Sequence, residues 1–74
     1  MKEIAPRIVI DKNIRFGRPI IKGTRIPVDI ILGKLSGGMS FEELMEEYEL
    51  SREDILAALR YAAQVISHEE IKVM

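Results

Sequence analysis

Four cations near the N-terminal end are the side chains best suited to chemistry in this 74-residue sequence. They lie within residues 15–28, RFGRPIIKGTRIPV, where glycine and proline direct the backbone between β-branched residues. Guanidinium and ammonium groups bind phosphates and carboxylates, and arginine does so through two parallel hydrogen bonds. We predict a basic hairpin whose partner-binding or nucleic-acid-binding residues are Arg15, Arg18, Lys22 and Arg25. Arg52 and Arg60 supplement this set.

These cations also have a purely structural interpretation. Arginine side chains pair with carboxylates on neighbouring helices, and their methylene stems cover apolar surface while the charged group stays in water. The sequence alone leaves both interpretations open.

A second cluster of charge is acidic and consists of Glu42, Glu43, Glu46 and Glu47. If residues 41–48 form a helix, these glutamates face away from its apolar side, which carries Phe41, Leu44, Met45 and Tyr48. Neighbouring carboxylates on a solvated helical face lack the burial that separates two pKa values for acid–base catalysis. We therefore predict an acidic face that contacts a partner.

The two clusters divide the charge of the chain unevenly. Residues 1–34 contain eight basic and three acidic side chains, whereas residues 35–74 contain three basic and nine acidic ones. The first part is therefore +5 and the second −6, within a total of −1. This asymmetry favours two surfaces that meet different partners, although solvated surface charge alone also explains it.

Nothing in the composition points to catalysis. The chain has one histidine, no cysteine and no spaced set of metal ligands, so we expect no enzymatic activity, no metal and no cofactor. The histidine, His68, is predicted to be a surface residue beside two glutamates. The sequence lacks a secretory signal and a bilayer-spanning apolar run, so a soluble, cytoplasmic protein is expected.

The elements expected to carry the cations are short strands. Residues 7–10 form a β-branched run, residues 11–13 a turn, residues 14–16 a possible returning strand, and Ile20-Ile21 a short edge strand. Residues 1–26 are therefore predicted to form a basic β-hairpin or three-stranded arm.

Three helices follow the arm. Val28, Ile31, Leu32 and Leu35 recur with helical spacing after Pro27, and Gly37-Gly38 ends that helix. Ser40 with Glu43 and Ser51 with Asp54 are capping pairs that begin the second and third helices. The third helix should reach Val65 or Ile66 and direct four apolar side chains inward. These are Ile55, Leu59, Ala62 and Ile66.

Together these elements predict one mainly α domain over residues 1–74. Residues 27–66 form its three-helix core and residues 67–74 a tail. Two capped helices across a tight turn, preceded by a third helix, are typical of a helix-turn-helix. The third helix, however, begins with Arg52-Glu53-Asp54 and the second carries four glutamates, so like-charge repulsion opposes contact with DNA phosphates.

The chain resembles the prokaryotic family called domain of unknown function 433. The resemblance rests on IRFGRPIIKGTRIPV (14–28), GMSFEE (38–43), LSREDI (50–55), AAL (57–59) and YAA (61–63). It implies a homeodomain-like trihelical core with a β arm. It also implies an antitoxin of the VapB kind that inhibits a PIN-like ribonuclease toxin encoded beside it and that also binds its own promoter.

Two mechanisms agree with that implied role. In one, Arg18 or Arg25 enters the carboxylate cluster of the nuclease and competes with its metal. In the other, the glutamate face occupies the surface that holds RNA. The alternative function is a dimeric helix-turn-helix regulator that acts on DNA without a toxin. A homodimer is expected in either case, because the chain is small, the hairpin has an exposed edge and the third helix has several alanines.

Overall fold

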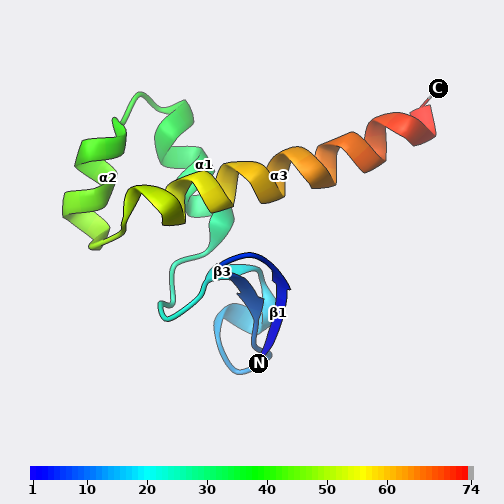
Figure 1. Ribbon diagram of the computed structural model, residues 1–74, viewed down its shortest axis with the longest axis horizontal. Coiled ribbons are helices and arrows are strands. Elements are labelled where there is room, and N and C mark those ends of the chain that lie inside the picture. The colour runs from blue at the N-terminus through cyan, green and yellow to red at the C-terminus, as the bar shows by residue number, and fades with distance from the viewer. Residues whose placement is uncertain (74) are drawn as a thin grey trace.

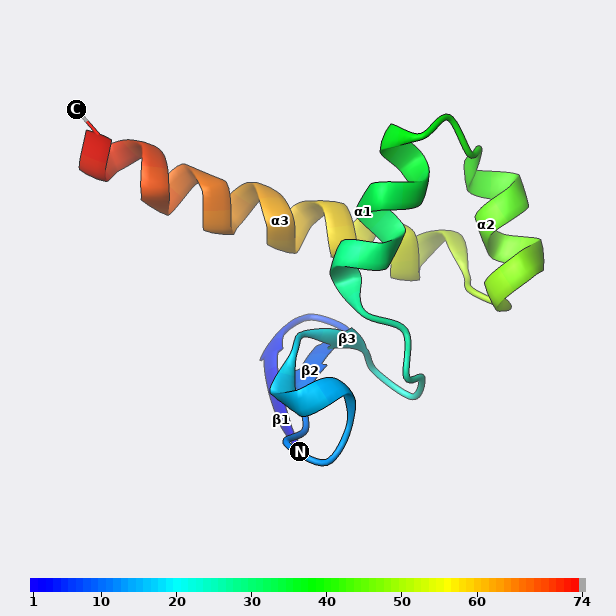
Figure 2. The same cartoon turned by 180° about the vertical axis from the view of Figure 1, so that it is seen from behind.

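A small β-sheet and three helices form the protein (Figure 1). The computed structural model describes the backbone of residues 1–73 and the side chains of residues 1–68. The sheet lies against one side of the helical part, and the last helix projects away from both (Figure 2). The predicted mainly α fold with an N-terminal β arm is confirmed.

The sheet contains β1 (Lys2–Ala5), β2 (Ile8–Ile10) and β3 (Ile20–Ile21), in the order β1-β2-β3 with both pairs antiparallel. Ile8 is opposite Ile21 and Val9 is opposite Ile20. All four of these side chains are buried. Because neighbouring residues of a strand point to opposite faces of the sheet, both faces of the β2–β3 pair are covered. The predicted strand at 20–21 is thus confirmed and lies at an edge, and the strand predicted at 7–10 is confirmed from Ile8, since Arg7 has a left-handed φ of 68° and belongs to the turn before β2.

The strand expected at residues 14–16 is wrong. Residues Arg15–Gly17 form a 3₁₀ turn, η1. The sheet still has three strands, because β1 at the N-terminus pairs with β2. The Asp11 carboxylate accepts a hydrogen bond from the backbone N–H of Asn13 at 2.9 Å, which turns the chain before it can extend. Because β1 has only one β-branched residue, its sequence gave little indication of a strand.

Helices α1 (Val28–Ser36) and α2 (Phe41–Tyr48) begin where the sequence predicts. Pro27 is the residue just before α1, and the Val28 N–H donates to the Pro19 carbonyl at 3.0 Å, which ties the start of the helix to the arm. Gly38 has φ 102°, the left-handed conformation that ends α1. The predicted capping box of α2 is present, with Ser40 and Glu43 bonded reciprocally.

Helix α3 (Arg52–Val73) is longer than predicted. Its start is confirmed, because the Ser51 N–H donates to Asp54 Oδ2 at 3.0 Å and the Asp54 N–H donates to Ser51 Oγ at 3.1 Å. The helix continues through Val73, beyond the expected end at Val65 or Ile66, so the predicted tail is helical up to that residue. Met74, the last residue of that tail, lies outside the described residues.

The core lies where α3 crosses α1, α2 and the sheet. Its members are Ile8, Ile21, Val28, Ile31, Leu44, Leu50, Ile55, Ala57 and Ala58. The inward set predicted for α3 is only partly right, since Ile55 is buried but Leu59 and Ile66 are 36% and 54% exposed. The body of the protein covers mainly the first turns of α3, and the small residues Ala57 and Ala58 fill the close contact there.

Candidate functional site

Residues 15–17 form an unusual turn, called here the arm turn. Arg15, Phe16 and Gly17 have φ values of 52°, 56° and 79°, so three successive residues are left-handed. This conformation costs a non-glycine residue about 1 kcal/mol, and it persists only where surrounding contacts hold it. Here the Gly17 N–H donates to the Ile14 carbonyl at 3.2 Å and the Arg18 N–H to the Arg15 carbonyl at 3.1 Å.

The consequence of this turn is the exposure of Phe16. Its side chain is 97% exposed, the highest value among the large apolar residues of the described chain. A fully solvated phenyl ring adds nothing to the fold, because its apolar surface remains in water. The sequence motif indicates the cations of this segment as binding residues. It does not indicate the ring of Phe16, which sequence reasoning missed.

The structure brings two of the predicted arm cations together. Arg15 Nε donates to the backbone carbonyl of Arg25 at 3.2 Å, which joins the arm turn to the loop before α1. Among the described side chains, neither Arg15 nor Arg25 has a carboxylate within ion-pair distance. Both residues are exposed, so their guanidinium groups are accessible to a partner.

The other two arm cations are already paired. Arg18 Nη2 forms an ion pair with Asp29 Oδ2, and Lys22 Nζ lies 3.3 Å from Glu3 Oε1. The Arg7 backbone N–H and the Lys22 ammonium group lower the pKa of Glu3. Since all four side chains are about half exposed, these pairs weaken but do not remove the positive charge of the arm.

Arg52 and Arg60 do not join the arm cations. Arg52 Nη2 lies 3.1 Å from Glu42 Oε2, and its guanidinium carbon stands 5.1 Å from the centre of the Phe41 ring, a cation–π arrangement. The side chain of Arg52, the first residue of α3, therefore lies against the surface of α2. Arg60 is exposed on α3, with no carboxylate of the described side chains within ion-pair distance.

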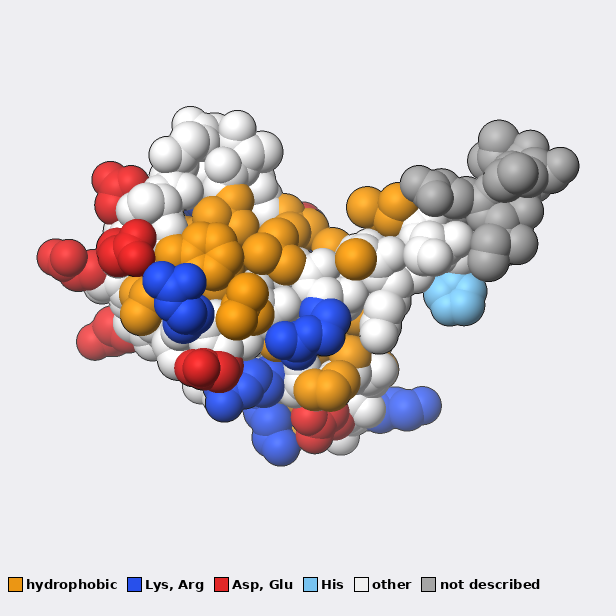
Figure 3. Space-filling model, turned by 45° about the horizontal axis from the view of Figure 1, so that its top comes forward, with side chains coloured by type: hydrophobic (Ala, Val, Ile, Leu, Met, Phe, Trp, Pro, Cys, Tyr) orange, Lys and Arg blue, Asp and Glu red, His pale blue; other side chains and the backbone are white. Residues whose placement is uncertain are grey.

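Of the predicted acidic partner face, only half is free of other contacts. Glu42 is paired with Arg52, and Glu43 is held in the capping box, where hydrogen bonds from the Ser40 backbone and hydroxyl group lower its pKa. Glu46 and Glu47 are exposed and, with Met39 and Glu43, line an open depression of about 410 Å³. Figure 3 shows acidic side chains gathered at the end of the molecule that α2 forms.

The basic and acidic parts of the chain remain separate surfaces. Among the described side chains, one ion pair joins residues 1–34 to residues 35–74, that of Arg7 with Asp54. Partial burial would raise the pKa of Asp54, but hydrogen bonds from Ser51 and Arg7 outweigh it, and the pKa is lowered. Sequence reasoning missed Arg7, because its partner is distant along the chain.

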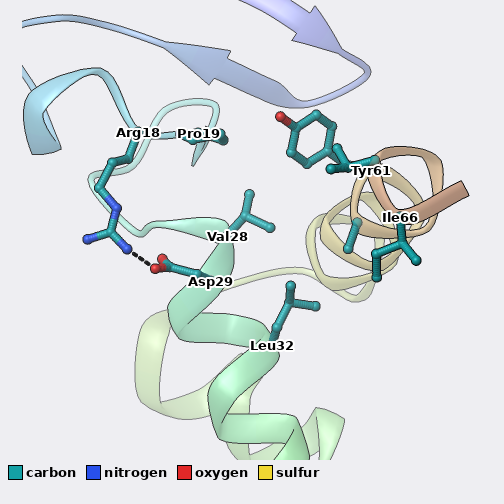
Figure 4. Close-up of a pocket in the computed structure, with 9 residues that line it drawn as sticks. Arg18, Pro19, Val28, Asp29, Leu32, Tyr61 and Ile66 are labelled. Atoms are coloured by element: carbon teal, nitrogen blue, oxygen red, sulfur yellow. Dashed lines mark ion pairs between the residues drawn. The ribbon is translucent and has the colours of Figure 1, made fainter. Parts of the chain in front are cut away.

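A third surface is an apolar groove of about 320 Å³ between α1 and α3 (Figure 4). Val28 and Leu32 of α1 face Tyr61 and Ile66 of α3 across it, and the Arg18–Asp29 pair stands at its edge. The remaining lining residues are Pro19, Ala62 and Val65. The spacing of Tyr61, Ala62, Val65 and Ile66 is the signal in the sequence, where Ala62 and Ile66 are predicted to point into the core.

Within the part of the chain that the structure describes, no three His, Asp or Glu side chains lie close enough together to hold a metal ion. No helix there combines the length and the apolar character that crossing a bilayer requires.

Comparisons with known proteins agree with this architecture. The family described as "Protein of unknown function (DUF433)" matches residues 8–62. The crystal structure of a DUF433 member from Anabaena variabilis superposes with a TM-score of 0.76 at 29% identity, over 90% of this chain and 67% of that one. An uncharacterized protein of Archaeoglobus fulgidus is 61% identical over 23 residues, which are 31% of this chain and 64% of that protein.

Proposed function

This chain belongs to the DUF433 family of proteins of unknown function, and we propose that it is an antitoxin that binds and inhibits a PIN-like ribonuclease toxin. The observation that carries the proposal is the arm turn, which holds an almost fully exposed Phe16 between arginines at a cost in backbone strain. An exposed aromatic residue flanked by arginines in the sequence has the composition that dominates binding energy at protein interfaces.

The chemistry of the arm turn suits the metal site of a nuclease. Such a site gathers carboxylates around a cation, and an arginine can replace the cation through paired hydrogen bonds. Arg15 and Arg25 are the better candidates for this step, because Arg18, expected alongside Arg25 from the sequence, is already paired with Asp29. Phe16 would fill an apolar recess beside the carboxylates and so fix the position of the arginines.

The acidic face offers a second contact with the same partner. Glu46 and Glu47 are exposed and unpaired among the described side chains, and they lie on α2, away from the arm turn. A surface that holds RNA is basic, so these carboxylates complement it.

Charge also weighs against the alternative, a helix-turn-helix regulator that acts on DNA alone. The fold contains the two helices, joined through Glu49, Leu50 and Ser51. The side chain of Arg52, however, is engaged by Glu42 and Phe41, and Asp54 by Arg7. The first turn of α3 therefore offers phosphates an exposed Glu53 and little free positive charge.

The test is co-expression with the product of the adjacent open reading frame, followed by size-exclusion chromatography and an RNA-cleavage assay. We expect a complex and loss of cleavage. Phe16→Ala and the double variant Arg15→Ala/Arg25→Ala should each weaken inhibition by about 30-fold or more, as truncation of an interface hot spot does. Lys34→Ala is the matched control, since Lys34 is an exposed cation on α1, outside the arm.

A separate double variant, Glu46→Gln/Glu47→Gln, measures the acidic contact. If neither the arm variants nor this one changes inhibition, both mechanisms are wrong. If no complex forms, and a promoter fragment binds with an affinity that falls steeply as salt rises, the regulator is the correct function.

A further inference from the structure

Helix α3 extends well past the body of the protein. Its 22 residues make it about 33 Å long, and only its first turns cross the sheet and the other two helices (Figures 1 and 2). Its buried core residues are Ile55, Ala57 and Ala58, whereas Val65 and Ile66 are 40% and 54% exposed. The part of α3 that projects beyond the body is short, and a short helix without packing partners is marginally stable in water unless its apolar face is covered.

The exposed part of α3 is not polar all round. Tyr61, Ala62, Val65 and Ile66 follow a helical spacing and form one wall of the apolar groove. Val28 and Leu32 form the opposite wall, on α1. The groove therefore lies beside the protruding stretch of helix and shares side chains with it.

We infer that a second copy of this chain covers the groove, with the α3 helices of the two copies packed against each other about a two-fold axis. A two-fold interface needs a patch that is complementary to itself. This patch qualifies, because it holds a hollow between α1 and α3 whose α3 wall carries the exposed side chains of Val65 and Ile66, and these can pack against the same wall of a second copy. Ala62 and Ala63 allow the two helices to approach closely.

The charges at the edge of the groove also favour a second copy of the chain as the partner that covers it. Its edge carries one cation and one anion, Arg18 and Asp29, whose side chains are 54% and 53% exposed. In a dimer whose two-fold axis passes near this edge, each charge gains an opposite neighbour and the interface remains neutral. A strongly charged partner, such as a nucleic acid, gains no net attraction from a neutral rim around an apolar hollow.

This arrangement differs from pairing through the edge of the sheet, which the sequence suggested. The sheet edge at β3 is covered, because Ile20 forms a β-bridge with Pro27. The groove lies between the arm turn and the free end of α3, and Glu46 and Glu47 are outside it. Arg15, Phe16 and Arg25 do not line the groove either, so the inference does not depend on the proposed function.

Sedimentation equilibrium of the purified full chain over a concentration series tests the interface. We expect the wild type to have twice the 8.4 kDa mass of one chain. Ile66→Glu should raise the dissociation constant by about a hundredfold or more, because it places an unpaired carboxylate in the apolar contact. Val65→Ser, a milder change in the same wall, should raise it by about tenfold.

Ile30→Glu is the matched control, since Ile30 is 42% exposed on α1 and does not line the groove. It should leave the dissociation constant unchanged, and circular dichroism of each variant establishes that its helices are formed. A wild type that is monomeric up to about millimolar concentration overturns the inference. So does a dimer that Ile66→Glu and Val65→Ser leave intact, or one that Ile30→Glu weakens equally.

Discussion

Arg7 Nη1 lies 2.8 Å from Asp54 Oδ1, and this ion pair joins the sheet to the first turn of α3. The other carboxylate oxygen of Asp54 accepts the backbone N–H of Ser51 at 3.0 Å. One side chain therefore caps the helix and holds the arm against it. Because the Asp54 side chain is only 17% exposed, water screens these contacts less than it screens the other ion pairs of the protein.

Removing either partner of this pair should destabilise the protein to different extents. Arg7→Ala removes the ion pair and a 3.4 Å hydrogen bond from Arg7 Nη1 to Ser51 Oγ, but leaves the cap in place. Because the Arg7 side chain is half exposed, this change should lower the free energy of unfolding by about 0.5–1.5 kcal/mol. Asp54→Ala also removes the cap and should cost about 1–3 kcal/mol. Urea unfolding measures both, with the exposed Arg60→Ala as control. Equal effects of the two variants would contradict the double role of Asp54.

Acid should weaken the same contact. The pKa of Asp54 is lower in the folded protein than in the unfolded chain, so the unfolded chain binds the proton first as the pH falls. The stabilisation is thus complete above about pH 5, declines through the ordinary carboxylate pKa near 4, and is lost below the folded pKa. Asp54→Asn should be less stable than the wild type at pH 7, and the difference should shrink towards pH 2.5. Urea unfolding at a series of pH values measures this, and a constant difference would contradict the assignment.

Stability and partner binding should respond in opposite directions at Phe16. Phe16→Gly relieves the left-handed backbone of an exposed residue, so the free energy of unfolding should rise by up to about 1 kcal/mol. The same change removes the ring and should weaken inhibition of the proposed partner ribonuclease by about 30-fold or more, as Phe16→Ala should. Gly17→Ala is the paired control, because a side chain at φ 79° is strained and should lower stability by about 1 kcal/mol. Urea unfolding and the RNA-cleavage assay give the two readouts. A Phe16→Gly protein less stable than Gly17→Ala would show that the ring supports the fold.

The parts of the fold that the sequence predicted are those with local signals. Ser40 with Glu43 and Ser51 with Asp54 place two helix starts correctly, because a capping pair involves residues only three apart. The arm turn was missed because its left-handed conformation depends on contacts such as that of Arg15 with the Arg25 carbonyl, ten residues away. The pairing of Arg18 with Asp29 was missed for the same reason. For the candidate site, the sequence therefore identified the residue types but not which cations are free.

The division of α3 into a buried and an exposed part is the feature that helical periodicity could not predict, because Ile55 and Leu59 lie one turn apart on similar faces. Ile55 is fully buried and Leu59 is 36% exposed, so their truncations should differ. Ile55→Ala should lower the free energy of unfolding by about 2–5 kcal/mol through lost burial and a residual cavity. Leu59→Ala should cost less than about 1 kcal/mol, because part of its surface is already in water. Both are measured by urea unfolding at the same protein concentration, with Leu44→Ala, fully buried on α2, as the reference for a core position. A Leu59→Ala loss as large as that of Leu44→Ala would mean that Leu59 is buried in solution, and the boundary between the two parts of α3 would then lie beyond it.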